Sequence, residues 1–341
     1  MPVNVGINGF GRIGRNVLRA ALESSNIQIT AVNDLGSAKN LGHLLKYDSL
    51  YGKFPGKVEY KKEDSLYVND REIKFYHERE PKNIPWGDEG IDVVIEATGI
   101  FKSKSELEQH LVGGAKKVVL TAPGKDVDTT VVMGVNHKDY NPEKHNIISN
   151  ASCTTNGLAP VAKVLEDKFG IEEGIMTTIH AYTNDQKLLD LPHDDLRRAR
   201  AANISMIPTT SGAARAVSLV LPQLEGKIDG IAIRVPVPIV SVIDFVVQLK
   251  KKANAEEVNA AFQESSRGNL EGILGVSQEP LVSIDYKGDS HSTVVDLLST
   301  MMMENGMLKI ISWYDNEWGY SMRVVDLTEY IAEKILSPAG V

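Results

Sequence analysis

A glycine-rich turn near the start of the chain constrains the fold more than any other feature of the sequence. A short apolar run leads into Gly9, Gly11 and Gly14, and a helical pattern follows directly. A second apolar run, residues 27–32, comes after that helix and is followed by Asp34, 20 positions beyond Gly14. A strand, a glycine turn, a helix and a second strand in this order predict two parallel strands joined by a right-handed crossover.

The spacing of the three glycines is typical of a dinucleotide-binding turn. Gly9 permits the tight turn, Gly11 lets the backbone approach a pyrophosphate, and Gly14 allows the helix to pack closely on the strand. The N-terminus of the helix attracts phosphate charge, and the backbone N–H groups of Arg12 and Ile13 are expected to contact the pyrophosphate. A glycine turn without a ligand is the weaker interpretation, because the strand, the helix and the acidic residue all stand where the motif requires them.

Asp34 indicates which dinucleotide is bound. Its carboxylate can accept two hydrogen bonds from a ribose diol, but it would repel a 2′-phosphate. We therefore expect NAD rather than NADP as the cofactor.

The rest of the pattern predicts an α/β protein with two domains. Apolar runs at 93–97, 117–120 and 147–149 extend the alternation of strands and helices, so we expect a Rossmann-type doubly wound parallel sheet over residues 1–151. From residue 152 onward, strand-like runs follow one another with fewer helices between them. Successive strands with few helices between them predict a second, α+β domain with a mixed or antiparallel sheet.

A capping box predicts one helix of the second domain. Asn254 is followed three residues later by Glu257, and a helical pattern runs from about 255 to 265. In such a box each side chain bonds the backbone N–H of the other residue, which fixes the start of the helix.

Composition and charge argue against several classes of protein. A hydrophobic share of 42% and a charged share of 24% over 341 residues are ordinary for globular domains. The formal net charge of −8 argues against broad nucleic-acid binding, although residues 197–200 form a local basic cluster. The most apolar stretch, residues 228–249, is interrupted by charged residues and prolines, so no membrane span is expected. The first residues show no secretory pattern, and we expect a cytoplasmic location.

The chain has a single cysteine, Cys153, which cannot form an internal disulfide. Hydroxyl-bearing residues flank it, and apolar residues recur at helical spacing from Leu158 to Phe169. A thiol at a helix N-terminus is stabilised as thiolate, so its pKa is expected below the ordinary value of about 8.5. On this segment alone, a reactive nucleophile and an inert buried cysteine are equally supported.

His180 and Arg234 are candidates to complete a site around Cys153. His180 ends an apolar run and opens a polar loop, a position suited to a general base, although a structural histidine is equally common there. Arg234 lies within an apolar strand, where a charge is costly unless it is paired. It either forms a buried ion pair or binds a substrate phosphate, and the hydroxyls at Thr183 and 209–212 favour the phosphate. No metal site is expected.

Several motifs together resemble the phosphorylating, NAD-dependent glyceraldehyde-3-phosphate dehydrogenase family. They occur in the order found in the family and cover essentially the whole chain. The motifs are residues 7–15, 149–156, 180–183, 211–214, 234–236 and 313–320.

The resemblance implies a reaction and an assembly. Cys153 would attack the aldehyde of glyceraldehyde 3-phosphate, a hydride would pass to NAD, and inorganic phosphate would attack the thioester to release 1,3-bisphosphoglycerate. His180 would activate the thiol and transfer protons, while the Cys153 backbone N–H holds the hemithioacetal oxygen. The resemblance also implies a homotetramer, a loop at about 182–203 that lines a neighbour's cofactor site, a catalytic domain over 152–317, and a C-terminal helix at 318–341 that completes the NAD-binding domain.

The matched motifs imply individual binding residues as well. The residues expected around the substrate phosphate are Thr183, Arg198 and Arg234. Those expected around a second anion site, for inorganic phosphate, are Ser152, Thr154, Ser211 and Gly212. Besides the three glycines, the residues expected to contact NAD are Arg12, Ile13, Asp34, Arg79, Thr121 and Asn316, the last through the nicotinamide amide.

Three positions depart from the family pattern. Gly157 stands where a second cysteine is frequent, Ser211 replaces the usual threonine, and Arg215 replaces the usual lysine. The hydroxyl and the positive charge are kept, so we expect an altered phosphate affinity rather than a loss of function.

Three alternative functions remain open at this point. Erythrose-4-phosphate dehydrogenase shares the thiol, histidine and cofactor motifs, but the turn at 211–215 favours the triose enzyme. A semialdehyde dehydrogenase of similar fold is disfavoured by the match at 313–320. A non-enzymatic protein that binds NAD or RNA is an alternative of another class, and it would be indifferent to the loss of Cys153.

Overall fold

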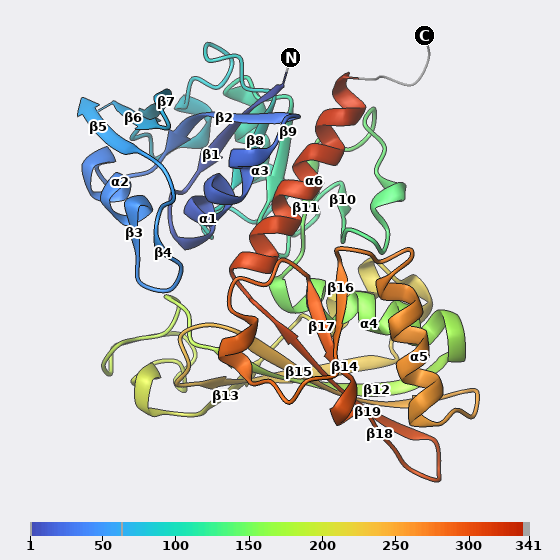
Figure 1. Cartoon of the computed structure of the whole chain (residues 1–341). Coiled ribbons are helices and arrows are strands. Elements are labelled where there is room, and N and C mark those ends of the chain that lie inside the picture. The colour runs from blue at the N-terminus through green and yellow to red at the C-terminus, as the bar shows by residue number, and fades with distance from the viewer. Residues whose placement is uncertain (1, 63, 337–341) are drawn as a thin grey trace. The chain divides into compact units, whose positions relative to one another are not determined.

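A nine-stranded sheet forms the centre of the first of two structural units (Figure 1). The computed structural model describes residues 2–62 and 64–336, and within these residues unit 1 comprises positions 2–131, 137–151 and 321–336. The strands of its sheet are β1 (Val3–Asn8), β2 (Ile27–Asn33), β5 (Val58–Lys62), β6 (Ser65–Val68), β7 (Arg71–Tyr76), β8 (Val93–Glu96), β9 (Lys117–Leu120), β10 (Thr129–Thr130) and β11 (Ile147–Ser149).

β1 lies near the middle of this sheet. It pairs in parallel with β2 on one side and with β8 on the other. The strand order is β10-β11-β9-β8-β1-β2-β7-β6-β5, and only β5 and β6 at one edge are antiparallel to their neighbours. The chain order reverses at β1, and doubly wound sheets bind ligands beyond the carboxyl ends of their strands at such a switch point. The predicted Rossmann-type sheet is confirmed.

Unit 1 also contains helices. They are α1 (Arg12–Ala20), α2 (Ala38–Lys46), α3 (Lys104–Val112) and α6 (Trp318–Leu336), of which the part from Ser321 onward belongs to this unit. A two-stranded ribbon is formed by β3 (Tyr47–Asp48) and β4 (Gly52–Lys53). All residues of β8 and β9 are buried, as expected for central strands of a parallel sheet that is covered on both faces.

Unit 2 comprises Val132–Asn136 and Ser152–Tyr320 and contains an eight-stranded mixed sheet. Its strands are β12 (Ile171–Ala181), β13 (Ile207–Thr210), β14 (Ile228–Val235), β15 (Ser241–Leu249), β16 (Leu274–Ser277), β17 (Thr293–Asp296), β18 (Met301–Met302) and β19 (Met307–Tyr314). β12 pairs with β14 and β16 pairs with β17 in parallel, whereas the other pairings are antiparallel. The predicted mixed sheet is therefore observed.

Two helices, α4 (Cys153–Phe169) and α5 (Ala255–Ser266), lie on the same side of this sheet (Figure 1). Every second residue of β15 is buried, from Ser241 to Leu249, which is the pattern of a strand with one face on a core. In α4 the side chains of Leu158, Val161 and Leu165 are fully buried. The apolar spacing that predicts this helix is thus the spacing that packs it.

The predicted capping box of α5 is confirmed. Oδ1 of Asn254 accepts a hydrogen bond from the Glu257 N–H at 2.8 Å, and the Glu257 carboxylate accepts one from the Asn254 N–H at 2.9 Å. None of the helices in the described part of the chain combines the length and the apolar character needed to cross a membrane.

Candidate active site

Cys153 is the first residue of α4. β11 ends at Ser149, Ala151 has a left-handed backbone with φ of 55°, and α4 begins two residues later. Oγ of Ser152 accepts a hydrogen bond from the Thr155 N–H at 3.0 Å and so caps the helix. The expected position of the thiol at a helix N-terminus is observed.

His180 faces the thiol from the end of β12. Its Nε2 lies 3.5 Å from Sγ of Cys153, and the residue is buried with 5% of its surface exposed. β12 and β14 are parallel neighbours, and their register places His180 opposite Arg234. The fold therefore brings together three predicted residues that lie far apart in the sequence.

Nδ1 of His180 has two close polar neighbours. It lies 2.6 Å from the carbonyl oxygen of Ala181, a contact that needs a proton on Nδ1. It also lies 2.8 Å from Nη1 of Arg234, which can only donate and needs the lone pair of Nδ1. The two contacts require opposite tautomers, and Arg234 also donates to the Ala181 carbonyl at 3.1 Å. Nε2 lies within reach of the thiol in both tautomers, as the position of a general base requires.

The surroundings of Cys153 and His180 disfavour the charged forms of both side chains, the thiolate and the imidazolium. Burial lowers the pKa of His180 to about 3, and the positive charge of Arg234 adds to this effect. Burial raises the pKa of the Cys153 thiol, while the charge of Arg234 and hydrogen bonds from Thr154 oppose the rise. The direction for Cys153 is opposite to the one expected from the helix N-terminus alone, because the desolvation of the buried thiolate outweighs the charge and the hydrogen bonds that favour it.

Tyr314 supports the first turn of α4 and was not identified from the sequence as a site residue. Its hydroxyl lies 2.8 Å from Oγ1 of Thr154 and 2.8 Å from Oγ1 of Thr178. Its ring meets the ring of His180 edge to face, with centroids 6.0 Å apart. Tyr314 is the last, buried residue of β19 and lies within the 313–320 motif, which as a whole does not single out this residue.

Arg198 is anchored beside this group by two aspartates. It donates to Asp185 at 2.7 Å and to Oγ1 of Thr209 at 3.0 Å, and Thr209 in turn donates to Asp195 at 2.6 Å. Its charge contributes to the lowered pKa of His180, after burial and Arg234. The sequence analysis had not identified the two aspartates or Thr209 as its partners.

The turn that follows β13 is tied to the start of α4. Oγ1 of Thr155 donates to the Ala213 carbonyl at 3.2 Å, and Oγ of Ser211 accepts from the Ala213 N–H at 3.2 Å. The Cα of Gly212 borders open space, since a Cβ there would meet no atom within 4 Å. Thr183 lies two residues beyond the end of β12.

Asn316 is oriented by Ser241, a second residue that the sequence analysis missed. Oγ of Ser241 accepts from the Ala181 N–H at 3.1 Å and donates to Oδ1 of Asn316 at 3.0 Å. Both side chains are buried. The amide nitrogen of Asn316 is therefore the end of the side chain that Ser241 does not hold.

A separate cavity of about 250 Å³ lies in unit 1 at the carboxyl ends of β1, β2 and β8. A Cβ on Gly9 would stand 2.5 Å from the Thr98 backbone nitrogen, and one on Gly14 would stand 2.2 Å from the Gly9 carbonyl oxygen. A Cβ on Gly11 would meet nothing within 4 Å, which leaves its backbone open to a ligand. The lining residues are Asn8, Gly9, Gly11, Asn33, Asp34, Leu35, Glu78, Arg79, Ala97, Thr98, Ile100 and Phe101.

Asp34 is held rigidly at the edge of this cavity. One carboxylate oxygen accepts from the Phe10 N–H at 2.7 Å and the other from the Gly36 N–H at 2.8 Å. Each oxygen keeps acceptor capacity for one further donor, so the carboxylate can still accept from the two hydroxyls of a ribose.

The other predicted cofactor residues of unit 1 lie around the same strand ends. Arg12 and Ile13 form the first turn of α1, and the Arg12 guanidinium donates to Asp48 at 2.5 Å. Thr121 follows β9 and donates through Oγ1 to the Glu96 carbonyl at 3.0 Å. Of these three, none lines the cavity, whereas Arg79 and Asp34 do.

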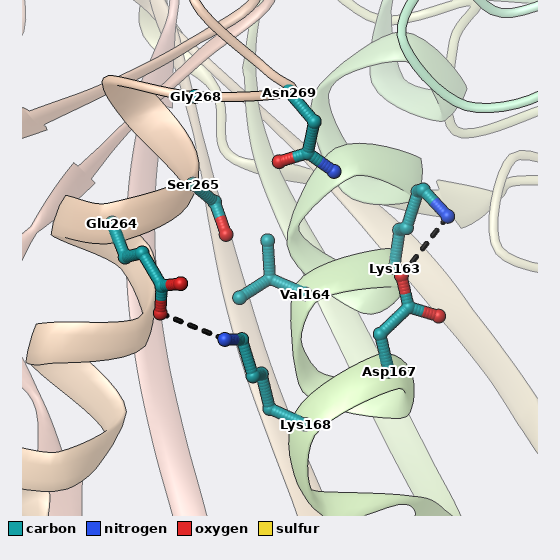
Figure 2. A pocket seen from close by; sticks show the side chains of 8 residues that line it. All are labelled: Lys163, Val164, Asp167, Lys168, Glu264, Ser265, Gly268 and Asn269. Atoms are coloured by element: carbon teal, nitrogen blue, oxygen red, sulfur yellow. Dashed lines mark hydrogen bonds and ion pairs between the residues drawn. The ribbon is translucent and has the colours of Figure 1, made fainter.

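A cavity of about 300 Å³ between α4 and α5 offers a different kind of surface (Figure 2). Lys163 pairs with Asp167 at 3.0 Å and Lys168 pairs with Glu264 at 2.7 Å, so the charges on its walls are already matched. No nucleophile or base of the kind found at Cys153 lines it. Among the described residues, no group of three or more histidine, cysteine or carboxylate side chains is arranged to hold a metal ion.

Comparison with known proteins identifies the family of the chain. Residues 3–104 match the family model for the NAD binding domain of glyceraldehyde 3-phosphate dehydrogenase, and residues 152–316 match the model for its C-terminal domain. Glyceraldehyde-3-phosphate dehydrogenase 1 of Bacillus cereus is 59% identical over 97% of this chain and 98% of its own length. The enzyme of Geobacillus stearothermophilus is 58% identical over 98% and 99%, and glyceraldehyde-3-phosphate dehydrogenase 2 of Bacillus subtilis is 55% identical over both full lengths. The chain belongs to the glyceraldehyde-3-phosphate dehydrogenase family.

Proposed function

We propose that Cys153 and His180 carry out the chemistry by which this chain, as an NAD-dependent dehydrogenase, converts glyceraldehyde 3-phosphate and inorganic phosphate into 1,3-bisphosphoglycerate. The observation that carries the proposal is the 3.5 Å approach of Sγ of Cys153 to Nε2 of His180. A thiol with a base at this distance can act as a nucleophile toward a carbonyl carbon.

The steps follow from the positions of the protons. Sγ of Cys153 bonds to the aldehyde carbon while its proton passes to Nε2 of His180, and His180 then gives this proton to the former carbonyl oxygen, which yields a hemithioacetal. NAD, when bound, accepts the hydride that leaves this carbon. His180 takes the hydroxyl proton at that step, and a thioester to Cys153 remains. A phosphate oxygen then attacks the thioester, the C–S bond breaks, and the thiol recovers its proton.

We assign two anion sites to these reaction steps, one for each phosphate. Arg234 and Arg198 lie close enough that the charge of Arg198 lowers the pKa of Arg234, after burial as the main cause. A bound phosphate would relieve this repulsion, so we assign the substrate phosphate to both arginines and to Thr183. The attacking phosphate is assigned to the backbone and hydroxyls at the N-terminus of α4 and the adjoining turn. These residues are Ser152, Thr154, Ser211 and Gly212.

The cofactor is assigned to the cavity of unit 1. Gly9, Gly11 and Gly14 shape the turn for the pyrophosphate, which the backbone N–H groups of Arg12 and Ile13 contact at the start of α1. The Arg12 side chain is engaged by Asp48, so its backbone rather than its guanidinium serves this purpose. Asp34, Arg79 and Thr121 complete the assignment within unit 1, which we assign as the NAD-binding domain. In unit 2, which we assign as the catalytic domain, Asn316 is proposed to bind the nicotinamide amide.

We also infer a homotetramer in the cytoplasm. Four leucines of the loop after β12 are more than half exposed, and such apolar surface is typical of a protein interface. These are Leu188, Leu189, Leu191 and Leu196. The single cysteine fits a reducing compartment.

A steady-state assay tests the proposed function. NADH formation from glyceraldehyde 3-phosphate should require inorganic phosphate and should prefer NAD over NADP. Turnover that does not depend on phosphate, or that is faster with erythrose 4-phosphate, would contradict the assignment. A protein that binds NAD but shows no turnover, and whose binding is unchanged by Cys153→Ser, would support the non-enzymatic alternative.

A further inference from the structure

A buried carboxylate beneath the cofactor cavity has no part in the chemistry described above. Glu96 is the last residue of β8, and none of its surface is exposed. An ionised carboxylate in such a place is costly unless hydrogen bonds compensate for the lost water. Its partners therefore show what the carboxylate is there to hold.

Four donor contacts converge on the two oxygens of Glu96. Oε2 accepts from the side-chain amide of Asn8 at 2.6 Å and lies 3.0 Å from Nε2 of His110. Oε1 accepts from the Thr98 N–H at 2.8 Å and from the Thr98 hydroxyl. A carboxylate with this number of donors is the form that the site fits.

Trp86 determines which ring nitrogen of His110 carries the proton that is donated to Glu96. The indole N–H of Trp86 can only donate, and it lies 3.0 Å from Nδ1 of His110. Nδ1 is thus an acceptor, and the ring proton resides on Nε2, where it is donated to Glu96. Trp86 and His110 are both fully buried, so this orientation is not shared with solvent.

On the side of the cofactor cavity, the hydrogen bonds are also donated in the direction of Glu96. The Glu78 N–H donates to Oδ1 of Asn33 at 2.8 Å, and Nδ2 of Asn33 donates to Oδ1 of Asn8 at 2.8 Å. The amide nitrogen of Asn8 is then the end that reaches Glu96. Every donor in this series of three hydrogen bonds points toward the carboxylate of Glu96. Glu78, Asn33 and Asn8 all line the cavity.

Glu96 also supports the glycine turn. The Thr98 backbone that it holds packs against Gly9 so closely that a Cβ on Gly9 would stand 2.5 Å from the Thr98 nitrogen. A shift of the Thr98 peptide would therefore displace Gly9. Since Gly14 packs equally closely on Gly9, the displacement would reach the start of α1.

We propose that Glu96 is a positioning residue for NAD: the carboxylate fixes Asn8 and Thr98, and through them the wall of the cavity and the turn that receives the pyrophosphate. The proposal rests on the assignment of the cofactor to this cavity, but not on the chemistry at Cys153. A residue that acts in this way changes the affinity for NAD and leaves the chemical step largely intact.

The test compares NAD binding by the full-length wild type and two variants, using calorimetry with NAD as the ligand. Glu96→Gln keeps the shape of the side chain but turns one acceptor into a donor that faces other donors. We expect its Kd for NAD to rise about 10- to 100-fold, since a hydrogen bond to a charged group is lost in a buried place. At saturating NAD its kcat should stay within about threefold of the wild type.

Val118→Ala is the matched control. Val118 is fully buried in β9, next to β8, and its truncation destabilises the same sheet without touching the cavity. Its Kd for NAD should remain within about twofold of the wild type, although its melting temperature falls. Equal values of Kd in Glu96→Gln and the wild type would overturn the proposal, as would an equal rise in both variants.

A second pair of variants keeps the test decisive if Glu96→Gln does not fold. Thr98→Val removes the hydroxyl donor at nearly constant shape, and the Kd for NAD should rise about 3- to 10-fold. Thr98→Ser keeps the hydroxyl and should restore the affinity. An unchanged Kd in Thr98→Val would overturn the proposal. A wild type that does not bind NAD at all would instead refute the proposed function.

Discussion

The thiol of Cys153 and the imidazole of His180 hold one transferable proton between them, and burial decides where it rests. Burial raises the pKa of the thiol and lowers that of the imidazole to about 3, so the neutral pair is favoured before substrate arrives. The site differs from an exposed helix terminus, where the dipole alone would favour thiolate. In our account the proton moves as the carbon–sulfur bond forms, with Arg234 close by to receive an anionic substrate.

Replacing His180 by Asn should flatten the dependence of stability on pH. The pKa of His180 is about 3 in the folded protein and about 6.5 in an unfolded chain, so the unfolded chain binds more protons between these values. The folded state therefore loses stability as the pH falls below about 6.5, by about 2 kcal/mol at pH 5. Urea unfolding at pH 7 and pH 5, at constant protein concentration, measures the difference.

The exposed His43 provides the control for this measurement. His43→Asn should keep the pH dependence of the wild type. The interpretation fails if His180→Asn loses as much stability between pH 7 and pH 5 as the wild type does.

Replacing Asp34 by Ala should weaken the preference for NAD over NADP. The change removes two acceptors for the ribose and the charge that repels a 2′-phosphate, and it also releases the Phe10 and Gly36 N–H groups. We expect the ratio of kcat/KM for NAD to that for NADP to fall at least about tenfold. A ratio equal to that of the wild type would remove Asp34 from the cofactor site.

Some residues of the site were predictable and others were not. Cys153, His180 and Arg234 could be proposed because a nucleophile, a base and a charge in an apolar strand are unusual in themselves. Tyr314 and Ser241 carry ordinary side chains, and their roles appear only when β19 and β15 bring them to Thr154 and Asn316. Such roles depend on strand pairing, which local patterns do not specify.

At the scale of secondary structure, the position of a strand end or a helix start matters more than its length. β12 and β14 end together, which sets His180 beside Arg234, and α4 starts where its cap at Ser152 allows. The glycine turn, the helix at Cys153 and the capping box of α5 could all be predicted, because each is determined by residues within a few positions. The pairing of β12 with β14 joins segments about 50 residues apart, and no local pattern predicts it.

The cap of α5 offers a direct test at this scale. Asn254→Ala removes the side chain that accepts from the Glu257 N–H, which should destabilise the helix by about 1 kcal/mol. For a unit of this size the melting temperature should fall by about 2–4 °C. Asn254→Ser retains an acceptor and should melt close to the wild type. Calorimetry that finds no difference between the Ala and Ser variants would show that the cap contributes nothing.

At the scale of the whole molecule, the exposed leucines after β12 form an apolar surface that indicates an interface. Leu196 is 82% exposed and Leu188 is 75% exposed, in a loop that the resemblance assigns to contacts between subunits. An apolar surface of this kind is typical of a protein interface.

Leu188→Asp combined with Leu196→Asp should weaken the proposed tetramer. Sedimentation velocity should find four chains in the wild type and smaller species in the double variant, because burying two carboxylates in an apolar interface is costly. Val112→Asp, on the equally exposed Val112 of α3, should not change the sedimentation. A wild type that sediments as a single chain would contradict the tetramer.

The central claim is that Cys153 carries the acyl group between oxidation and phosphorolysis, and stopped-flow absorbance of NADH tests it most directly. With glyceraldehyde 3-phosphate and NAD but no phosphate, the wild type should release about one NADH per chain in a burst and then nearly stop, because the thioester accumulates. Addition of phosphate should restore turnover, and Cys153→Ser should give no burst. Sustained NADH formation without phosphate, or a full burst from the Cys153→Ser variant, would contradict the account.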